Sequence, residues 1–305
     1  MYTRREFGQL TVAALALPRA LMAATGSTVG GVRVGVQTYS FRGLPRPAGG
    51  DAVDGIIAAM TACGLDHCEL WSPQLEPATA PGPRPAAGSP EAEKARAELR
   101  AWRLSTPLDH FRGVRKKFES AGLSILGFNY SFNPSFTDEE IERGFEMARA
   151  LGAGFITAST TLPVARKVVP FAEKHKMTVA MHGHSKVDDP DEFATPASFA
   201  AALKMSKYFK VNLDIGHFTA GGFDPVAYLR EHHADVTNIH VKDRKKNQGE
   251  NTPWGQGDTP IREVLQLIKA NKWPIPAGIE YEYKGTGTPV EEVKRCYDYV
   301  RQALA

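Results

Sequence analysis

Short β-rich runs alternate with helical stretches along residues 32–304, and this alternation repeats eight times. The expected strands are Val32–Phe41, His67–Ser72, Ser124–Phe132, Phe155–Thr160, Thr178–Ser185, Val211–Phe218, Val236–Asp243 and Ala277–Tyr283. Each run has the length and apolar content of a strand buried in a parallel sheet. The repeated alternation predicts an α/β fold, a (β/α)8 TIM barrel in a single domain. A doubly wound open sheet is the alternative, but no glycine-rich turn follows the first expected strand.

The expected helices carry start and stop signals. They cover residues 51–62, 91–121, 138–151, 163–175, 195–208, 224–233, 260–272 and 289–304. Thr137 followed by three acidic residues is typical of a capping box, and Pro196 after Thr195 is typical of a first helical position. The expected C-cap glycines are Gly64, Gly122 and Gly152.

Composition excludes several classes of protein. The chain has 37 Lys and Arg against 34 Asp and Glu, a net charge of +3, so charge gives no reason to expect binding to nucleic acid or to a membrane surface. Its 3 cysteines, Cys63, Cys68 and Cys296, cannot form a disulfide framework in a chain of 305 residues. No run approaches the ~18 uninterrupted apolar residues of a membrane span. We therefore expect a globular mature protein without a membrane anchor.

Residues 1–24 are typical of a targeting segment. Arg4 and Arg5 stand before a mildly apolar stretch, and Arg19 precedes a zone of small residues that ends at Ala24. Two adjacent arginines before a weakly hydrophobic core resemble a twin-arginine export signal, which is an address and not an anchor. We expect residues 1–24 to be the signal peptide, residues 25–305 to be the barrel, and the protein to be periplasmic or otherwise exported. The alternative is an incidentally basic terminus.

A proline-rich stretch, residues 73–90, follows the second expected strand. The loops after barrel strands lie on the face where such barrels carry active sites. Two interpretations remain open: a solvated insertion, or a lid or oligomer contact.

Ligand-type residues occupy the ends of four consecutive expected strands. The segments are Ala180-Met181-His182-Gly183-His184, Leu213-Asp214-Ile215-Gly216-His217, Ile239-His240-Val241-Lys242-Asp243 and Gly278-Ile279-Glu280-Tyr281-Glu282. A single strand histidine is usually a hydrogen-bonded core residue, and a single aspartate is usually part of a turn. Imidazoles and carboxylates on four successive strand ends converge on the barrel axis, where burial is costly unless they pair or bind a metal. The combination predicts a divalent metal site with nitrogen and oxygen ligands.

The Asp-x-x-His of residues 214–217, the His-x-Lys-Asp of residues 240–243 and Glu280 resemble the xylose isomerase-like TIM barrel superfamily. The superfamily includes sugar isomerases and epimerases, inosose dehydratase-like enzymes and endonuclease IV. The resemblance covers about residues 32–304. It implies that Asp214, His240 and Glu280 are metal ligands, that His217 contacts substrate or a metal-bound water, and that Lys242 and Asp243 organise the rim of the site.

The fifth expected strand departs from the pattern of the sugar epimerases. Those enzymes have a glutamate there that is both a metal ligand and a base, whereas this chain has His182, with His184 two residues later. Histidine can still bind the metal, and either His182 or His184 could be the ligand. Glu280 is then the clearest carboxylate base, with His184 or His217 as its partner. This favours a reaction in which one base removes a proton alpha to a carbonyl and a leaving group departs.

Weaker candidates line the ends of the first three expected strands. Glu69 and Trp71 share a face of the second strand and could line a sugar pocket, although a tryptophan there can equally belong to the core. Tyr39 and Asn129 end the first and third strands and could contact sugar hydroxyls.

We expect a divalent-metal-dependent enzyme of the sugar isomerase or epimerase type, with His182, Asp214, His240 and Glu280 as metal ligands. Glu280, His217, His184 and Lys242 are the expected catalytic residues. Histidine ligands favour one Mn, Co, Zn or Fe ion over Mg. The alternatives are a periplasmic 3-keto-glycoside lyase or dehydratase of the same superfamily, and a non-catalytic sugar-binding protein. The expected partner is a small sugar or keto-glycoside, and a homo-oligomer is possible.

Overall fold

A computed structural model describes residues 26–47, 50–77, 86 and 88–305 of the chain. The expected signal peptide, residues 1–24, lies outside the described residues. Residues 78–85 and 87, which form much of the proline-rich stretch, also lie outside them.

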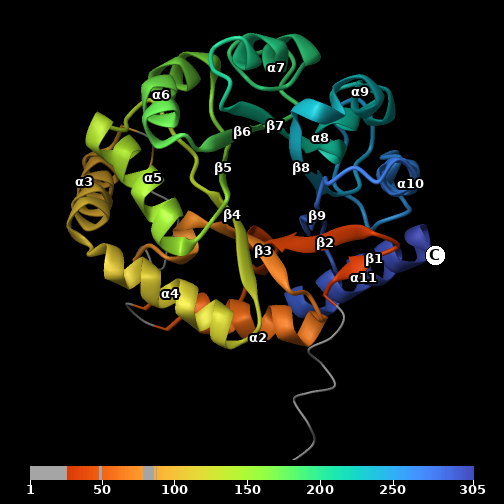
Figure 1. The fold of residues 1–305 in the computed structure, drawn as a ribbon, viewed down its shortest axis with the longest axis horizontal. Helices are drawn as coiled ribbons and strands as arrows, with labels where there is room; N and C mark the ends of the chain where they lie inside the picture. Colours follow the sequence, from red (N-terminus) through yellow and green to blue (C-terminus); the bar gives the residue numbers. More distant parts are fainter. Residues whose placement is uncertain (1–25, 48–49, 78–85, 87) are drawn as a thin grey trace, which may run out of the picture.

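A closed parallel barrel forms the centre of the described residues (Figure 1). Its strands are β2 (Val32–Gln37), β3 (His67–Trp71), β4 (Ser124–Asn129), β5 (Phe155–Ala158), β6 (Thr178–His182), β7 (Phe209–Asp214), β8 (Val236–Val241) and β9 (Ala277–Ile279). Neighbouring strands pair in parallel in chain order, and β2 pairs with β9 to close the ring. The predicted (β/α)8 TIM barrel in a single domain is therefore confirmed, and the open sheet is wrong because an open sheet has no pairing between its edge strands.

One short strand was not expected. In β1 (Thr28–Val29), Thr28 pairs with Arg33 of β2 in antiparallel register, and the chain turns at Gly30 and Gly31. Both glycines have positive φ, the conformation that a tight turn of this kind requires.

Helices surround the barrel in Figure 1. They are α2 (Val53–Cys63), α3 (Pro90–Ser105), α4 (Leu108–Ser120), α5 (Asp138–Leu151), α6 (Leu162–His175), α7 (Pro196–Leu203), α8 (Ile215–Ala220), α9 (Pro225–His232), α10 (Ile261–Asn271) and α11 (Pro289–Leu304). The capping box at Thr137 is confirmed, and Gly64 and Gly152 are left-handed C-caps as predicted. Ala121 is the C-cap of α4, and Gly122 with its positive φ follows it.

Every expected strand runs one to four residues beyond its observed end, and one expected helix is two helices. The single helix expected over residues 91–121 is divided into α3 and α4 at Thr106 and Pro107, because the residue before a proline disfavours helical backbone. The strand expected over Val211–Phe218 begins two residues earlier and ends at Asp214. Its last four residues begin α8, since the Asp214 side chain accepts a hydrogen bond from the His217 backbone N–H and caps this helix.

Apolar and polar side chains are separated by layer. The largest fully buried side chains are mostly phenylalanines, such as Phe111, Phe145 and Phe199 on the surrounding helices. The buried polar residues of the strands include Gln37, Glu69, Asn129, Thr157, His182, Asn212, Asp214, Asn238 and His240. Many of these side chains hydrogen-bond to one another across the ring, so the barrel interior is polar at its carboxyl half. Among the helices of the described part of the chain, none is long and apolar enough to cross a membrane.

Candidate functional site

The four expected metal ligands lie together at the carboxyl ends of the barrel strands. His182 ends β6, Asp214 ends β7, His240 lies near the end of β8, and Glu280 follows β9. Asp214 is directly in register with His240, and His240 with Gly278, so the strands bring these side chains to one level. One ligand atom from each of the four lies within 4.8 Å of the others, and all four residues are buried. We call this group the strand-end cluster.

The strand-end cluster has the types of ligand atom that a metal requires. Nδ1 of His182, Oδ2 of Asp214, Nδ1 of His240 and Oε2 of Glu280 are all buried, and none has a hydrogen-bond partner of good geometry among the described residues. The two carboxylate oxygens form ion pairs with the Lys242 ammonium, and His240 Nδ1 lies 3.2 Å from Glu280 Oε2. Buried polar atoms without partners are rare because each costs about 1–3 kcal/mol. Two imidazole nitrogens and two carboxylate oxygens around one space form a donor set suited to Mn²⁺, Fe²⁺, Co²⁺ or Zn²⁺. The residues therefore fit a divalent ion.

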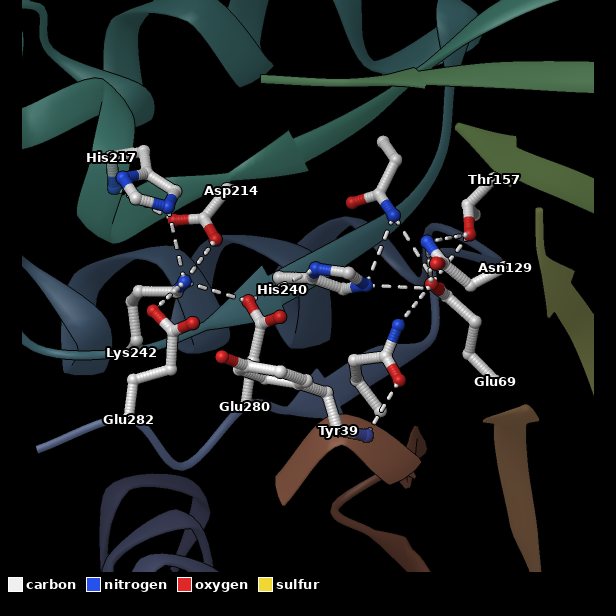
Figure 2. Close-up of polar contacts among 12 residues, drawn as sticks. Tyr39, Glu69, Asn129, Thr157, Asp214, His217, His240, Lys242, Glu280 and Glu282 are labelled. Atoms are coloured by element: carbon white, nitrogen blue, oxygen red, sulfur yellow. Dashed lines mark hydrogen bonds and ion pairs between the residues drawn. The ribbon is translucent and has the colours of Figure 1, made fainter. Parts of the chain in front are cut away.

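Lys242 brings a positive charge to the same carboxylates. Figure 2 shows its ammonium group between Asp214, Glu280 and Glu282. Its Nζ lies 3.0 Å from Asp214 Oδ2, 2.8 Å from Glu280 Oε2 and 2.5 Å from Glu282 Oε2. The Lys242 side chain is only 2% exposed, so little water screens these ion pairs. This lysine partly neutralises two of the candidate ligands.

Burial and neighbouring charges shift the pKa values of the cluster in different directions. Burial raises the pKa of Asp214 to about 7, although Lys242 opposes the shift. Burial would also raise the pKa of Glu280, but Lys242 and His240 outweigh it and hold that pKa well below its usual range. Burial would lower the pKa of Lys242, but Asp214 and Glu280 raise it. Burial, His240 and His184 hold the pKa of His182 well below its usual range, so His182 is a neutral potential ligand.

His240 is supported from the barrel interior. Its Nε2 lies 2.9 Å from Glu69 Oε2, and its Nδ1 lies 3.2 Å from Glu280 Oε2 (Figure 2). Burial would lower the pKa of His240, but Glu69 and Glu280 raise it well above its usual range. A carboxylate on the outer nitrogen of a histidine fixes its ring orientation and increases its strength as a metal ligand.

Glu69 lies beneath the cluster and not in an open pocket. Side chains from five other strands donate to its carboxylate: Gln37, Asn129, Thr157, Asn212, Asn238 and His240. Glu69 is 6% exposed. Asn129 is also buried, and its amide donates to Thr157 and Glu69. Because these groups are already engaged, Glu69 and Asn129 support the barrel interior, and the sugar contacts that we expect of them stay a prediction.

Tyr39 and Trp71 lie at the barrel mouth. Both are half-buried, and their rings meet edge to face with centroids 4.8 Å apart. They come from the segments that follow β2 and end β3, on the same face as the strand-end cluster. Partly exposed aromatic rings at this position remain candidate sugar contacts.

His184 and His217 lie beside the cluster on the solvent side. Their ring centroids are 5.3 Å apart, and the His184 ring lies 5.0 Å from that of His182. His184 contacts Glu192 and His217 contacts Arg244, each at 2.6 Å. Burial and then Lys242 hold the pKa of His217 well below its usual range.

Sequence reasoning missed several residues of the site. Glu192 and Arg244 lie in loops, and Asn212 and Asn238 point into the barrel interior. The alternation of Glu280 and Glu282 on one face was a signal for Glu282. Asp243, which the resemblance places at the rim, accepts hydrogen bonds from the backbone of Gly255, Gly257 and Thr259 and so holds that loop in place.

Comparison with known proteins gives one family and distant relatives. The family described as "Xylose isomerase-like TIM barrel" matches residues 57–302. The L-ribulose-5-phosphate 3-epimerase UlaE of Escherichia coli (strain K12) is 24% identical over 145 residues, 46% of this chain and 49% of that protein. The chain thus spans about half the length of the curated relatives that it matches.

Solved structures show the same fold at low identity. The probable 3-DHS dehydratase AsbF from Bacillus anthracis, involved in petrobactin synthesis, has a TM-score of 0.60 and 14% identity, covering 88% of this chain and 98% of that one. The IolI protein, solved with a zinc atom bound, has a TM-score of 0.61 and 14% identity, covering 90% of this chain and 99% of that one. These likenesses establish the fold alone.

Proposed function

The chain belongs to the xylose isomerase-like TIM barrel family, and from this we propose a divalent-metal-dependent sugar enzyme of the isomerase or epimerase type. It removes a proton alpha to a carbonyl of a sugar or keto-sugar. Relatives in the family include an epimerase and a probable dehydratase, and both names are consistent with chemistry next to a carbonyl.

One observation carries the proposal. Four buried ligand atoms at the strand-end cluster, one each from His182, Asp214, His240 and Glu280, lie within 4.8 Å of one another. A binding protein for neutral sugars has no need to bury two imidazoles and two carboxylates around one space, because the cost of desolvating them is high. A metal-dependent enzyme needs this arrangement.

These four residues would hold the metal ion. When bound there, a divalent ion supplies Lewis-acid stabilisation of the negative charge that develops on a sugar's oxygens after proton removal. Lys242 adds a fixed positive charge within 3.0 Å of Asp214 and Glu280, and so stabilises the anionic side chains when no ligand is present. Glu280 is held ionised, which is the state that a base requires.

Elimination is the second candidate reaction. Both cluster carboxylates flank β8, Asp214 from β7 and Glu280 after β9, while β6 contributes His182. Passing a proton from one face of a ketose to the other uses a base on each face of the sugar. Here both carboxylates come from the β7 to β9 side of the barrel, and the β6 side contributes a histidine instead. Removal of the alpha proton by one base, with loss of a beta substituent, fits this one-sided arrangement and would make the protein a keto-glycoside lyase or dehydratase.

The substrate proposal depends on the cellular location. A twin-arginine signal at residues 1–24 would export the protein, and sugar phosphates are cytoplasmic metabolites. We therefore propose a sugar or keto-glycoside without phosphate as the substrate.

Solvent hydrogen exchange tests the proposal directly. The zinc- or manganese-loaded protein is incubated in D₂O with ketoses, 3-keto-glycosides and ketose phosphates, and deuterium at the alpha carbon is followed by NMR. We expect incorporation with a keto-sugar that lacks phosphate, and its loss in Glu280→Gln and after metal removal. Glu263→Gln is the matched control, because Glu263 is exposed on α10 and lies outside the site.

The outcomes separate the alternatives. Exchange with an isomeric product supports an isomerase or epimerase, and exchange with release of an aglycone or water supports a lyase. Exchange with ketose phosphates alone would contradict the proposed substrate. Sugar binding without exchange for any metal and any of these sugars would indicate the non-catalytic alternative.

A further inference from the structure

His184 is oriented by a carboxylate. Its Nδ1 lies 2.6 Å from Oε1 of Glu192, and its side chain is 32% exposed. A carboxylate accepts a hydrogen bond and cannot donate one when it is ionised, so the Nδ1 of His184 carries a proton. In the neutral ring the other nitrogen, Nε2, is then a bare acceptor. This Nε2 makes no hydrogen bond to a described residue.

His217 is oriented by a guanidinium. Its Nδ1 lies 2.6 Å from Nη1 of Arg244. Arginine only donates and stays charged in proteins, so the Nδ1 of His217 must be the bare nitrogen. Arg244 is itself fixed, since its other donors reach the backbone oxygen of Gly249 and the hydroxyl of Ser185. In the neutral ring the proton of His217 is then on Nε2.

Lys242 does not reverse this assignment. Its Nζ lies 3.2 Å from Nε2 of His217, but the three carboxylates described above lie closer and can accept all three of its protons. Lys242 therefore has no proton left to donate to His217, and Nε2 of His217 does not have to be an acceptor.

We propose that Glu192 and Arg244 are positioning residues that give His184 and His217 opposite hydrogen-bonding roles at the mouth of the site. His184 presents an acceptor at Nε2, and His217 presents a donor at Nε2. The same side-chain type thus performs two roles because one ring is held by an anion and the other by a cation.

The consequence concerns how a substrate is oriented, and this part rests on the proposed function. The two rings are neighbours, with centroids 5.3 Å apart. A ligand with a hydroxyl next to a carbonyl can donate from the hydroxyl to His184 and accept at the carbonyl from His217 in one direction. In the reversed ligand the hydroxyl can still accept from His217, but the carbonyl oxygen, which only accepts, faces the bare Nε2 of His184. The pair therefore selects one orientation of a hydroxy-carbonyl group.

A second metal ion is the competing explanation for these histidines. One nitrogen each of His182, His184 and His217 lies within 4.8 Å of the others. However, Arg244 uses one nitrogen of His217 and the Lys242 ammonium lies 3.2 Å from the other. Two positive charges at this ring oppose a further cation, and so the geometry favours the hydrogen-bonding roles.

Nitrogen NMR of the histidine rings tests the assignment without any substrate. Protein labelled with ¹⁵N in histidine is loaded with zinc, which is diamagnetic, and spectra are recorded at alkaline pH, where the rings are neutral. His184→Gln and His217→Gln assign the resonances. We expect the ring proton on Nδ1 in His184 and on Nε2 in His217. The same tautomer in both rings would overturn the proposal, and so would zinc bound at two equivalents with both rings coordinated.

Variants test the cause of the tautomers. Glu192→Ala should shift the His184 proton toward Nε2 and leave His217 unchanged, while Asp191→Ala, at an exposed neighbouring position, should change neither. Arg244→Met should give His217 a mixture of tautomers, and Arg244→Lys should restore the wild-type spectrum in part. Lys245→Met is the matched charge control. An unchanged His184 resonance in Glu192→Ala overturns the role of Glu192, and an equal shift in Asp191→Ala shows that net charge alone is responsible.

Two features keep these outcomes interpretable. The His175 ring, which contacts Glu142 on the outer helices, reports whether a variant remains folded. The tautomers are measured without turnover, so a failed hydrogen-exchange assay with correct tautomers would contradict the proposed function and leave the positioning roles in place.

Discussion

The Nε2 of His240 lies 2.9 Å from the Glu69 carboxylate, and the two residues are 171 positions apart in the chain. Glu69 comes from β3 and His240 from β8, so this contact crosses the barrel interior. It leaves the other nitrogen of His240 facing the strand-end cluster. The barrel interior thus fixes the orientation of His240, a candidate metal ligand.

Replacing Glu69 by glutamine is expected to weaken metal binding without removing a ligand. Glutamine can still accept from His240, but it lacks the charge that strengthens the imidazole. Loss of such supporting contacts typically lowers metal affinity by about 10–100-fold. Zinc affinity measured by competition with a chromophoric chelator checks this, with Glu98→Gln on exposed helix α3 as the control. Equal affinities in Glu69→Gln and the wild type would contradict the supporting role.

Removing a cluster ligand is expected to abolish metal binding. The wild type should retain about one equivalent of Mn, Co, Zn or Fe after dialysis, and Asp214→Ala and His240→Ala should retain almost none, since each removes one of four donors. Metal content by mass spectrometry provides the measurement. Asp109→Ala and His110→Ala are matched controls, because both residues are exposed on α4. Metal retained by Asp214→Ala would place the ion elsewhere.

Lys242→Met is expected to destabilise the metal-free protein more than the metal-loaded one. Without the ammonium group, Asp214, Glu280 and Glu282 lose their shared counter-charge. Breaking a buried ion pair typically costs about 3–5 kcal/mol, and a bound cation would offset part of this. Urea unfolding with and without zinc measures both values.

Lys210→Met is the control for that experiment. It breaks a partly exposed pair with Asp235, which should cost at most about 1 kcal/mol. A loss for Lys242→Met no larger than that of this control, in the absence of metal, would show that the cluster charges are compensated in another way.

Asp66 is expected to make stability depend on pH in the acid range. Its hydrogen bond with His67 is the main cause that holds its pKa below the usual value, and Ser27 also donates to it. A carboxylate whose pKa is lower in the folded state stabilises the fold above its unfolded pKa of about 3.9, and this contribution is lost as pH falls below that value. Asp66→Asn should therefore flatten the decline of the melting temperature below about pH 4. An unchanged decline would show that other carboxylates dominate it. The 41% exposure of the Asp66 side chain implies a small effect.

Much of the fold could be predicted from local pattern. Short apolar strands and helices with caps such as Thr137 and Gly152 are specified by short stretches of chain, because backbone preference and capping act over a few residues. One boundary error arose where a side chain acts on the next element. The cap that Asp214 gives α8 ended a strand that β propensity alone would have extended.

The sequence by itself determined that four ligand-type residues would stand at neighbouring strand ends, since parallel strands in chain order present their carboxyl ends at one face. Only the tertiary structure decided which charges meet there. The Lys242 ammonium lies among three carboxylates, and Glu69 contacts His240 from the barrel interior. An anion, Glu192, contacts the His184 ring, and a cation, Arg244, contacts the His217 ring. The physical reason is that long side chains and loop residues can reach several alternative partners. A strand position is fixed by the sheet, whereas the contacts of a long side chain or a loop residue depend on rotamers and on segments far away in the sequence.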